Sequence, residues 1–321
     1  MTRNSMIAAA AGALGGILLV AAWQGSVFGI LLGLVFSSVP LMMTVFGFGI
    51  TFLPVAVAGG AVAVTVLTGS FALTAFYLVF DGLPVAILAR IGLAAERLAV
   101  AAPAGTIPRL GGLAIGLPVV WLVIAAVALM GTGFVMFPAG PNGLEAGLIE
   151  RLDQLVTESG VLRDVPDTAR AALVKTMARV MPGAAAWNWS FRAIASAVVG
   201  QALLARDRFA RWPTPAYRTL AVPGWYVGGF WVATIAALLA PGDIGLIVAN
   251  AAVVMSLPLV LQGLAVVHCA AARFGFGRMA LAAFYGVSLV VAGPALVLIV
   301  TLGVMEHFSQ MRRRMMAQNG G

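Results

Sequence analysis

Long apolar runs separated by short polar joints make up most of this chain, and one longer polar segment interrupts them. The runs recur at lengths near the roughly 20 residues that a helix needs to cross a bilayer core of about 30 Å. Strands of a membrane barrel would alternate apolar and polar residues instead. We therefore predict an all-α, polytopic transmembrane helical bundle of about nine spans, with a range of eight to ten. The expected spans are 6–23, 26–58, 60–80, 82–101, 112–137, 184–205, 220–240, 244–269 and 279–305.

The run at 26–58 contains its own interruptions, at Ser37, Ser38 and Pro40 and again at Pro54. Because proline removes a helical hydrogen bond, this run is either one kinked helix or two short helices. Backbone groups that are freed at membrane depth need protein or a water-filled cavity beside them. We expect this broken element to face the interior of the bundle.

Residues 139–182 form the one long segment too polar for hydrocarbon. They separate an N-terminal membrane half, 1–138, from a C-terminal membrane half, 183–308, and a basic polar tail follows at 309–321. We expect the central module to be extramembrane or interfacial and to form an amphipathic helical hairpin on the membrane domain. A lid or gate is the alternative use of the same hairpin.

Two helices are predicted in this module. The first follows Asn142, an expected N-cap with Glu145 three residues on, and ends at Gly160. The second covers Asp167 to Met181 and closes at Pro182. Apolar residues share one face of each helix: Leu144, Leu148, Leu152 and Leu155 in the first, and Leu173, Met177 and Val180 in the second.

The composition agrees with a membrane protein, because 62% of the 321 residues are hydrophobic and 9% are charged, whereas about 25% are charged in soluble domains. The net charge of +8 comes almost entirely from arginines spread over loops. This distribution favours topology signals over nucleic-acid binding. Cys269 is the only cysteine, so no disulfide forms within the chain. We expect the lipid bilayer, and no nucleic acid, as a partner.

The residue inventory argues against several kinds of chemistry. The only lysine, Lys175, does not follow a glycine-rich loop, so a P-loop nucleotide site is absent. His268 and His307 are the only histidines and have no partners at metal-ligand spacing. Neither a serine-hydrolase elbow nor a zinc-protease motif occurs. We predict no catalytic residue, no metal, no cofactor and no enzymatic activity.

Basic loops suggest the orientation of the spans. The linker Arg206–Arg218 and the loop Arg273–Arg278 are expected on one face, because two apolar runs separate them. The positive-inside rule places both in the cytoplasm. A single crossing by 279–305 would put Arg312–Arg314 on the opposite side. Either the segment around Pro294 does not cross cleanly, or the linker is external.

Polar residues inside apolar runs are the candidates for ligand binding, because charge at membrane depth is expensive. They are Asp81, Arg192, Asn250 and Gln262. Asp81 also stands at a glycine and proline turn signal, where it could cap the following helix. Arg192 could bind an anion, pair with Asp81 or extend to the headgroups. Asn250 and Gln262 could each make an interhelical hydrogen bond instead.

The first span has a smooth face. Small residues at intervals of four allow close approach of another helix, and they form two parallel ridges here. These ridges either dock a partner helix or pack against another helix of the same chain. The candidate docking residues are Ala8, Ala9, Gly12, Ala13 and Gly16.

Several segments of the chain share a pattern with one family: Phe80–Arg90, Leu257–His268, the run containing Gly293 and Pro294, and the ending Leu302–Phe308 with Arg312–Arg314. Together they resemble the YybS-like family of bacterial membrane proteins of unknown function. In that family an aspartate often stands near the end of the last span, whereas this chain has Glu306 and then His307.

The resemblance implies kinship with the substrate-binding S components of energy-coupling-factor transporters, and more distantly with a rod-shape membrane protein that scaffolds cell-wall synthesis. It implies an S-component-like N-terminal half in the bacterial inner membrane. S components dock their first span on a membrane coupling subunit through small residues spaced by four, and Ala9 with Ala13, or Ala8 with Gly12, match that spacing.

Two functions follow as hypotheses. The leading one is a transporter-like component that binds a small molecule and has no ATPase of its own. The alternative is a membrane scaffold or assembly factor for a cell-envelope or other membrane complex.

Overall fold

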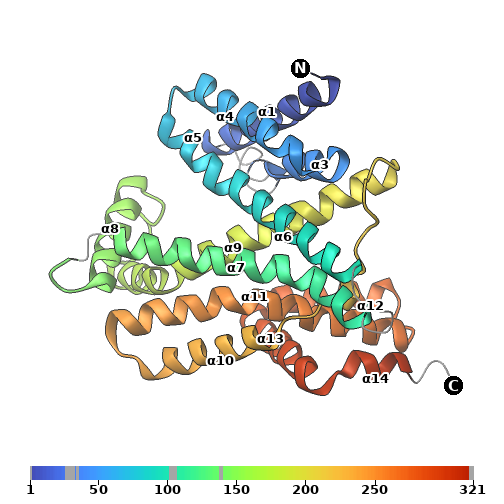
Figure 1. The fold of residues 1–321 in the computed structure, drawn as a ribbon. Helices are drawn as coiled ribbons and strands as arrows, with labels where there is room; N and C mark the ends of the chain where they lie inside the picture. The colour runs from blue at the N-terminus through green and yellow to red at the C-terminus, as the bar shows by residue number, and fades with distance from the viewer. Residues whose placement is uncertain (1, 26–32, 34–35, 101–106, 137–139, 318–321) are drawn as a thin grey trace. The chain divides into compact units, whose positions relative to one another are not determined.

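The computed structural model describes the chain except for residues 1, 26–32, 34–35, 101–106, 137–139 and 318–321. Within these described ranges every element is a helix, and an isolated bridge between Gly140 and Gly143 is the only strand-like pairing. The predicted all-α class is therefore confirmed. The elements in Figure 1 are α1 (Arg3–Trp23), α3 (Val39–Phe48), η1 (Ile50–Phe52), α4 (Leu53–Thr68), α5 (Phe71–Tyr77), η2 (Leu78–Gly82), α6 (Leu83–Val100), α7 (Ile107–Met136), α8 (Leu144–Ser159), α9 (Asp167–Arg206), η3 (Tyr217–Thr219), α10 (Gly224–Leu239), α11 (Gly242–Arg273), α12 (Arg278–Val290), α13 (Ala292–Ser309) and α14 (Met311–Ala317).

The chain divides into two compact units, each built from two separate stretches. Unit 1 comprises Met1–Leu122 and Trp189–Leu220, and unit 2 comprises Val123–Asn188 and Ala221–Gly321. Helices α7 and α9 each contribute to both units. The predicted divisions after residues 138, 182 and 308 follow polarity along the sequence, which is a different criterion, and they stay a prediction.

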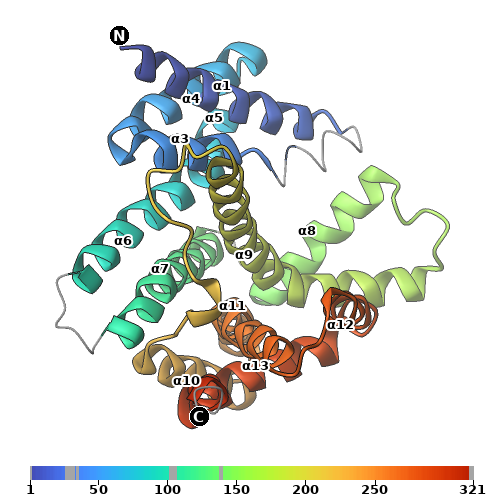
Figure 2. The same ribbon diagram turned by 90° about the vertical axis from the view of Figure 1, so that its right-hand side faces the viewer.

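In unit 1, α1 lies along α4, and α4 and α5 form an antiparallel hairpin (Figure 2). Gly69 ends α4 with a left-handed φ of 64°, and the Ser70 hydroxyl caps α5 by accepting from the Leu73 amide at 3.2 Å. A 2.7 Å bond between Thr65 and Thr74 joins the two helices beside the turn. The core of this unit includes Leu41, Met42, Val45, Val64, Tyr77 and Val85, all fully buried.

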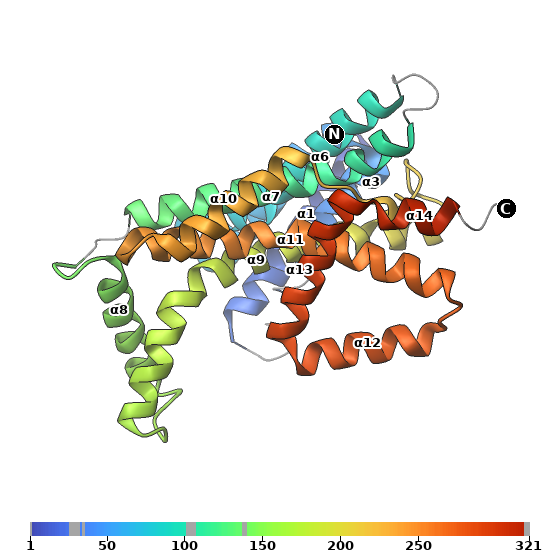
Figure 3. The ribbon, with the colours of Figure 1, turned by 90° about the horizontal axis from the view of Figure 1, so that it is seen from below.

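In unit 2, α10 packs on α11, where the Tyr226 hydroxyl donates to the Met255 carbonyl at 2.8 Å. α13 crosses α11 (Figure 3). The crossing is close because Gly303 has no side chain, and a Cβ there would overlap the Leu259 carbonyl. Backbone contact of this kind is typical of helices that pack in membranes.

Six helical stretches in the described ranges are long and apolar enough to cross a membrane. The prediction of about nine spans is therefore not confirmed. The six are Arg3–Trp23, Ile50–Thr68, Phe71–Ala95, Gly112–Met136, Gly242–Arg273 and Ala292–Ser309, and the shorter apolar helices are Val39–Phe48, Gly224–Leu239 and Arg278–Val290.

Several predicted bounds were wrong. The expected span 60–80 is interrupted at Gly69 and Ser70, and its second part continues into the next helix as Phe71–Ala95. The expected span 184–205 is the second part of α9 and is not among the six.

The run at 26–58 consists of separate helices over its described residues, so the kinked single helix was wrong. Pro40 lies in the first turn of α3 and Pro54 in the first turn of α4. Proline is tolerated in that turn because its missing N–H has no intrahelical partner there. Residues 26–32 and 34–35, which begin the predicted run, lie outside the described residues.

The central module contains the two expected helices, but their ends differ. Gly160 ends α8 as predicted, with a left-handed φ of 68°. The predicted Asn142 cap was wrong, because Gly143 occupies the N-cap position of α8. The Asp243 carboxylate of α11 caps α8 instead, accepting from the amides of Leu144 at 2.8 Å and Glu145 at 3.2 Å.

The second module helix does not close at Pro182, because α9 continues through that proline to Arg206. Beside the proline, the Gly183 amide donates to the Asn250 side-chain oxygen at 2.7 Å, and the Asn250 amide donates to the Arg179 carbonyl at 2.9 Å. A distant side chain thus bonds the backbone groups around the proline, which lets the helix continue.

The expected span 279–305 is not one helix, because α12 and α13 meet at a bend at Val291 (Figure 3). The Arg273 guanidinium at the end of α11 donates to the Met315 carbonyl of α14 at 2.6 Å. The basic end of α11 and the basic tail therefore lie together in unit 2. This contact favours the alternative in which the segment around Pro294 does not cross cleanly.

Candidate functional site

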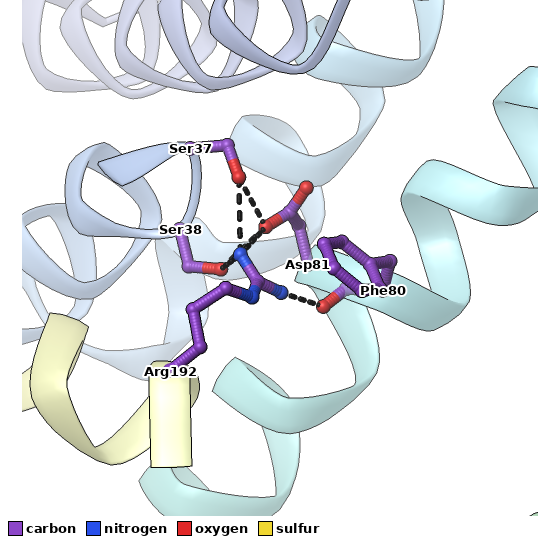
Figure 4. Close-up of polar contacts among 5 residues, drawn as sticks. All are labelled: Ser37, Ser38, Phe80, Asp81 and Arg192. Atoms are coloured by element: carbon purple, nitrogen blue, oxygen red, sulfur yellow. Dashed lines mark hydrogen bonds and ion pairs between the residues drawn. The ribbon is translucent and has the colours of Figure 1, made fainter. Parts of the chain in front are cut away.

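Asp81 and Arg192 form a buried ion pair in unit 1 (Figure 4). Arg192 Nη1 donates to Asp81 Oδ1 at 2.7 Å, and the two residues are 4% and 0% exposed. Of the three alternatives for Arg192, pairing with Asp81 is the one observed. Extension of the guanidinium to the headgroups was wrong, because the group lies inside the unit.

Two serine hydroxyls complete one side of the pair (Figure 4). Ser37 donates to Asp81 Oδ1 at 2.8 Å, and Ser38 donates to the same oxygen. Arg192 Nη1 also lies 3.1 Å and 2.9 Å from the two hydroxyls. Ser38 is the N-cap residue of α3 but makes no capping bond, so its hydroxyl is available to the carboxylate. Sequence reasoning noticed these serines only as an interruption of a span.

The π-helical turn η2 supplies the other side. The Phe80 carbonyl accepts from Arg192 Nη2, and the guanidinium lies over the Phe80 ring, 3.9 Å from its centre. Asp81 is therefore inside a continuous helical stretch from Phe71 to Ala95, and the prediction that it caps a helix at a turn was wrong. π-turns inside helices are frequent at functional sites.

Three buried polar atoms at this cluster have no hydrogen-bond partner among the described residues: Asp81 Oδ2, Arg192 Nε and the Tyr77 hydroxyl. Tyr77 precedes Asp81 by one helical turn, and its hydroxyl packs against Gly60 of α4. Each buried polar group without a partner costs about 1–3 kcal/mol. The cluster thus retains one acceptor, one donor and one hydroxyl that can do both.

The arrangement suits binding of a small polar group better than bond-making chemistry. The charges of Asp81 and Arg192 cancel, so the cluster as a whole does not attract a bare ion strongly. No group of three or more metal-ligating side chains occurs among the described residues. A ligand that both donates and accepts hydrogen bonds would satisfy the partnerless atoms.

Asn250 and Gln262 lie in unit 2 and are both buried, but their side chains already have backbone partners. Asn250 bonds the backbone around Pro182. Gln262 accepts from the Val222 amide at 2.7 Å and donates to the Gly303 carbonyl at 2.6 Å. Both amides therefore make the interhelical bonds that were the alternative to ligand binding.

The small-residue face of α1 packs within the chain. A Cβ on Gly12 would overlap the Ala56 carbonyl of α4, and one on Gly16 would lie 2.7 Å from the Gly60 carbonyl. Ala8 is fully buried. Ala9 and Ala13, the second ridge, are partly buried, and the Ala9 carbonyl faces Gly59. Docking of a partner on the Gly12 ridge would therefore have to displace α4.

A second buried ion pair lies in unit 2 and was not predicted. Arg312 Nε donates to Glu306 Oε1 at 2.9 Å, and the Arg312 amide donates to Oε2 at 3.1 Å. Gln310 between them has a left-handed φ of 50°, which turns the chain from α13 into α14. A signal was present in the sequence, since an acid and a base six residues apart flank the end of the last apolar run.

The model of a family described as "Predicted membrane protein (DUF2232)" matches residues 13–306. No curated protein and no solved structure matches the chain.

Proposed function

Because the chain belongs to the DUF2232 family of predicted membrane proteins, we propose that it is a transporter-like membrane component that binds a small polar molecule and has no ATPase of its own. The observation that carries the proposal is the buried Asp81 and Arg192 pair with its three partnerless polar atoms. The relation to YybS-like proteins and S components, and the location in the bacterial inner membrane, belong to the same proposal.

The depth of the pair supports a binding role. Asp81 is the eleventh residue of the 25-residue apolar stretch Phe71–Ala95, which places it near the middle of a crossing helix. Ionised side chains are rare there and usually mark a substrate or ion pathway. Broken helices at the same depth are a further feature of transporter sites, and here α3, η1 and α4 replace one continuous helix.

Both ionic groups are almost fully buried, so the cluster is closed to bulk solvent. A ligand would have to displace neighbouring side chains to reach the free oxygen, Asp81 Oδ2. Binding would then open the closed arrangement and give the partnerless atoms ligand contacts. Such an exchange between a closed and an open arrangement is what a binding component of a transporter requires.

Thermal stabilisation tests this proposal. A ligand that binds only the native state stabilises it by about 2.7 kcal/mol at about 100 times its Kd. We expect at least one compound from a panel of amino acids, vitamins and other polar metabolites to raise the Tm of the purified protein. Tyr77→Phe should weaken the affinity for that ligand about tenfold, the equivalent of one hydrogen bond, and so roughly halve the stabilisation at the same ligand concentration. The protein itself should keep or gain stability, because a partnerless hydroxyl is removed.

The matched control is Glu306→Gln, which alters the other buried pair and should leave ligand stabilisation unchanged. If no compound stabilises the wild-type protein and no small molecule co-purifies with it, the proposal is wrong. It is also wrong if Tyr77→Phe and Asp81→Asn both retain the full ligand effect, since binding would then lie elsewhere.

A scaffold or assembly role is the second candidate, and exposed apolar residues in the central module favour it. Leu173, Met177 and Val180 follow one another on one face of α9 and are 45%, 38% and 52% exposed, whereas Val174 and Ala178 are buried. This face matches the apolar face predicted from spacing. Exposed apolar residues at helical spacing suit a helix or a membrane surface as partner.

Replacement of Leu173, Met177 and Val180 by serine separates the two functions. Because these side chains are exposed, the membrane helices should still fold. The matched control replaces exposed polar residues such as Glu158 and Arg163 by serine. Loss of a protein crosslinked in native membranes from the apolar variant, but not from the control, would support the scaffold role. An unchanged crosslinking pattern contradicts it.

A further inference from the structure

An apolar groove of about 350 Å³ lies in unit 1 beside the candidate site. One wall is a single face of the helical stretch from η2 into α6, where Leu78, Gly82, Ala86 and Arg90 follow at intervals of four residues. Leu78 and Ala86 are apolar, and Gly82 leaves the groove floor open. Only the last position of this face is charged.

The opposite wall comes from η1 and the start of α4, with Ile50, Leu53 and Val57 among its residues. A Cβ on Gly82 would lie 3.5 Å from a Val57 methyl group, which is ordinary van der Waals contact. The missing side chain at Gly82 therefore makes the groove deeper, although a methyl group at this position would fit without a clash. The groove is partly open at its side, and it lies among helices that are long enough to cross a bilayer.

Arg90 gives the groove a polar end. It is exposed and has no ion pair among the described residues. Eight residues separate it from Gly82, which corresponds to about 12 Å along a helix. With Asp81 near the middle of a hydrocarbon core of about 30 Å, Arg90 lies close to the headgroup boundary. The groove thus runs from headgroup depth to the middle of the membrane.

More positive charge lies at the same end. The groove begins at Ile50, and the preceding residue, Gly49, lies against Arg211, whose nitrogen would be 3.2 Å from a Cβ at that position. Arg211 belongs to the loop 206–218, which carries four arginines and one aspartate. An occupant with an apolar body and an anionic end would match both the walls and this end of the groove.

We propose that this groove binds one acyl chain of an anionic glycerophospholipid, with the lipid phosphate paired to Arg90. The volume is at the lower end of the range for small-ligand sites and suits a single chain rather than a partner helix. Basic side chains at the membrane surface attract anionic lipids, and a preformed groove adds selectivity. This inference does not depend on the proposed function at the Asp81 cluster.

Binding of phosphatidylglycerol and phosphatidylcholine to the purified protein, measured by native mass spectrometry after lipid titration, tests the proposal. Ala86→Trp fills the groove and should weaken phosphatidylglycerol binding at this site about tenfold. Arg90→Gln should weaken it about fivefold and remove the preference over phosphatidylcholine. Arg90→Lys keeps the charge and should retain the preference.

Two further variants serve as controls, one for misfolding and one for changes outside the groove. Gly82→Ala narrows the groove without a clash, so a smaller loss of lipid affinity is expected even if Ala86→Trp fails to fold. Val66→Trp changes a residue of α4 that is 77% exposed and lies outside the groove, and it should leave lipid binding unchanged. Lipid binding that survives both Gly82→Ala and Arg90→Gln in full contradicts the proposal. So does equal binding of the two lipids by the wild-type protein, or a tightly held apolar compound other than a phospholipid.

Discussion

The two buried ion pairs differ in how far apart in the sequence their partners lie. Asp81 and Arg192 in unit 1 are 111 positions apart, whereas Glu306 and Arg312 in unit 2 are six apart. Both pairs have short contacts, of 2.7 Å and 2.9 Å, and all four residues are nearly inaccessible. The distance between the charged atoms and the burial of the side chains therefore do not distinguish the two pairs.

What distinguishes them is how completely their polar atoms are used. Both carboxylate oxygens of Glu306 accept hydrogen bonds, one of them from a backbone amide of the turn. Asp81 accepts three hydrogen bonds at one oxygen, from Ser37, Ser38 and Arg192, and its other oxygen has no partner among the described residues. The local pair connects α13 to α14 and uses both carboxylate oxygens of Glu306. The long-range pair connects η2 to α9 and to the serines before α3, and it leaves polar atoms without a hydrogen-bond partner. This difference is the reason why we propose a binding role for Asp81 and a structural role for Glu306.

The largest effect is expected when one partner of the long-range pair is removed. Arg192→Gln leaves Asp81 as a buried charge without its main partner, and such losses cost about 3–5 kcal/mol. We expect a marked drop in the Tm of the detergent-purified protein. Replacement of both residues by apolar side chains should recover much of the stability, because a buried pair itself contributes little net stability. That double variant should still fail to bind the ligand.

Arg312→Gln should cost less, about 1–3 kcal/mol. Helix α14 has only seven residues, so its release can expose Glu306 to water or headgroups. Thermal unfolding of the two single variants side by side measures the difference. Equal losses would show that the pairs do not differ in the way we infer.

Sequence reasoning found the members of the long-range pair but not their surroundings. Asp81 and Arg192 stood out because charge is rare in apolar runs, and their pairing was one alternative among three. The roles of Ser37 and Ser38 could not be predicted, since nothing in helical spacing relates α3 to η2. The π-turn could not be predicted either, because a glycine and a proline after Asp81 are equally typical of a helix cap.

The same limit explains the errors in helix bounds. A proline predicts the end of a helix only if no other group bonds the freed backbone, and Asn250 supplies such bonds beside Pro182. The cap of α8 comes from Asp243, about 100 residues later. Local signals therefore gave the helical class and the end at Gly160, while long-range bonds decided the remaining boundaries.

A medium effect is expected at the α1 and α4 contact, which belongs to the unit that holds the long-range pair. Gly12→Ala places a Cβ into the Ala56 carbonyl, and we expect a loss of about 1–3 kcal/mol from overpacking. Gly131→Ala in α7 is the matched control, because no atom lies within 4 Å of its Cβ position. It should be neutral or stabilise by up to about 1 kcal/mol. A neutral Gly12→Ala would mean that this face is free for a partner helix, as in the docking hypothesis.

The smallest energetic effect, and the clearest consequence for topology, is expected at Arg273. Its side chain is only partly buried and contacts the Met315 carbonyl and the Phe274 ring, so Arg273→Gln should change the stability by about 1 kcal/mol or less. The bond nevertheless requires the loop after α11 and the basic tail to lie on one side of the membrane, which the positive-inside rule makes cytoplasmic.

In a Cys269→Ser background, single cysteines at Phe276 and Arg313, both exposed, should react alike with a membrane-impermeant reagent: both unlabelled in intact cells and both labelled in inverted vesicles. A cysteine at Thr214 in the basic linker should behave in the same way if our prediction for Arg206–Arg218 is right. Opposite labelling of Phe276→Cys and Arg313→Cys would mean that α12 and α13 together cross the membrane once, and that the local contacts of unit 2 do not persist in the bilayer.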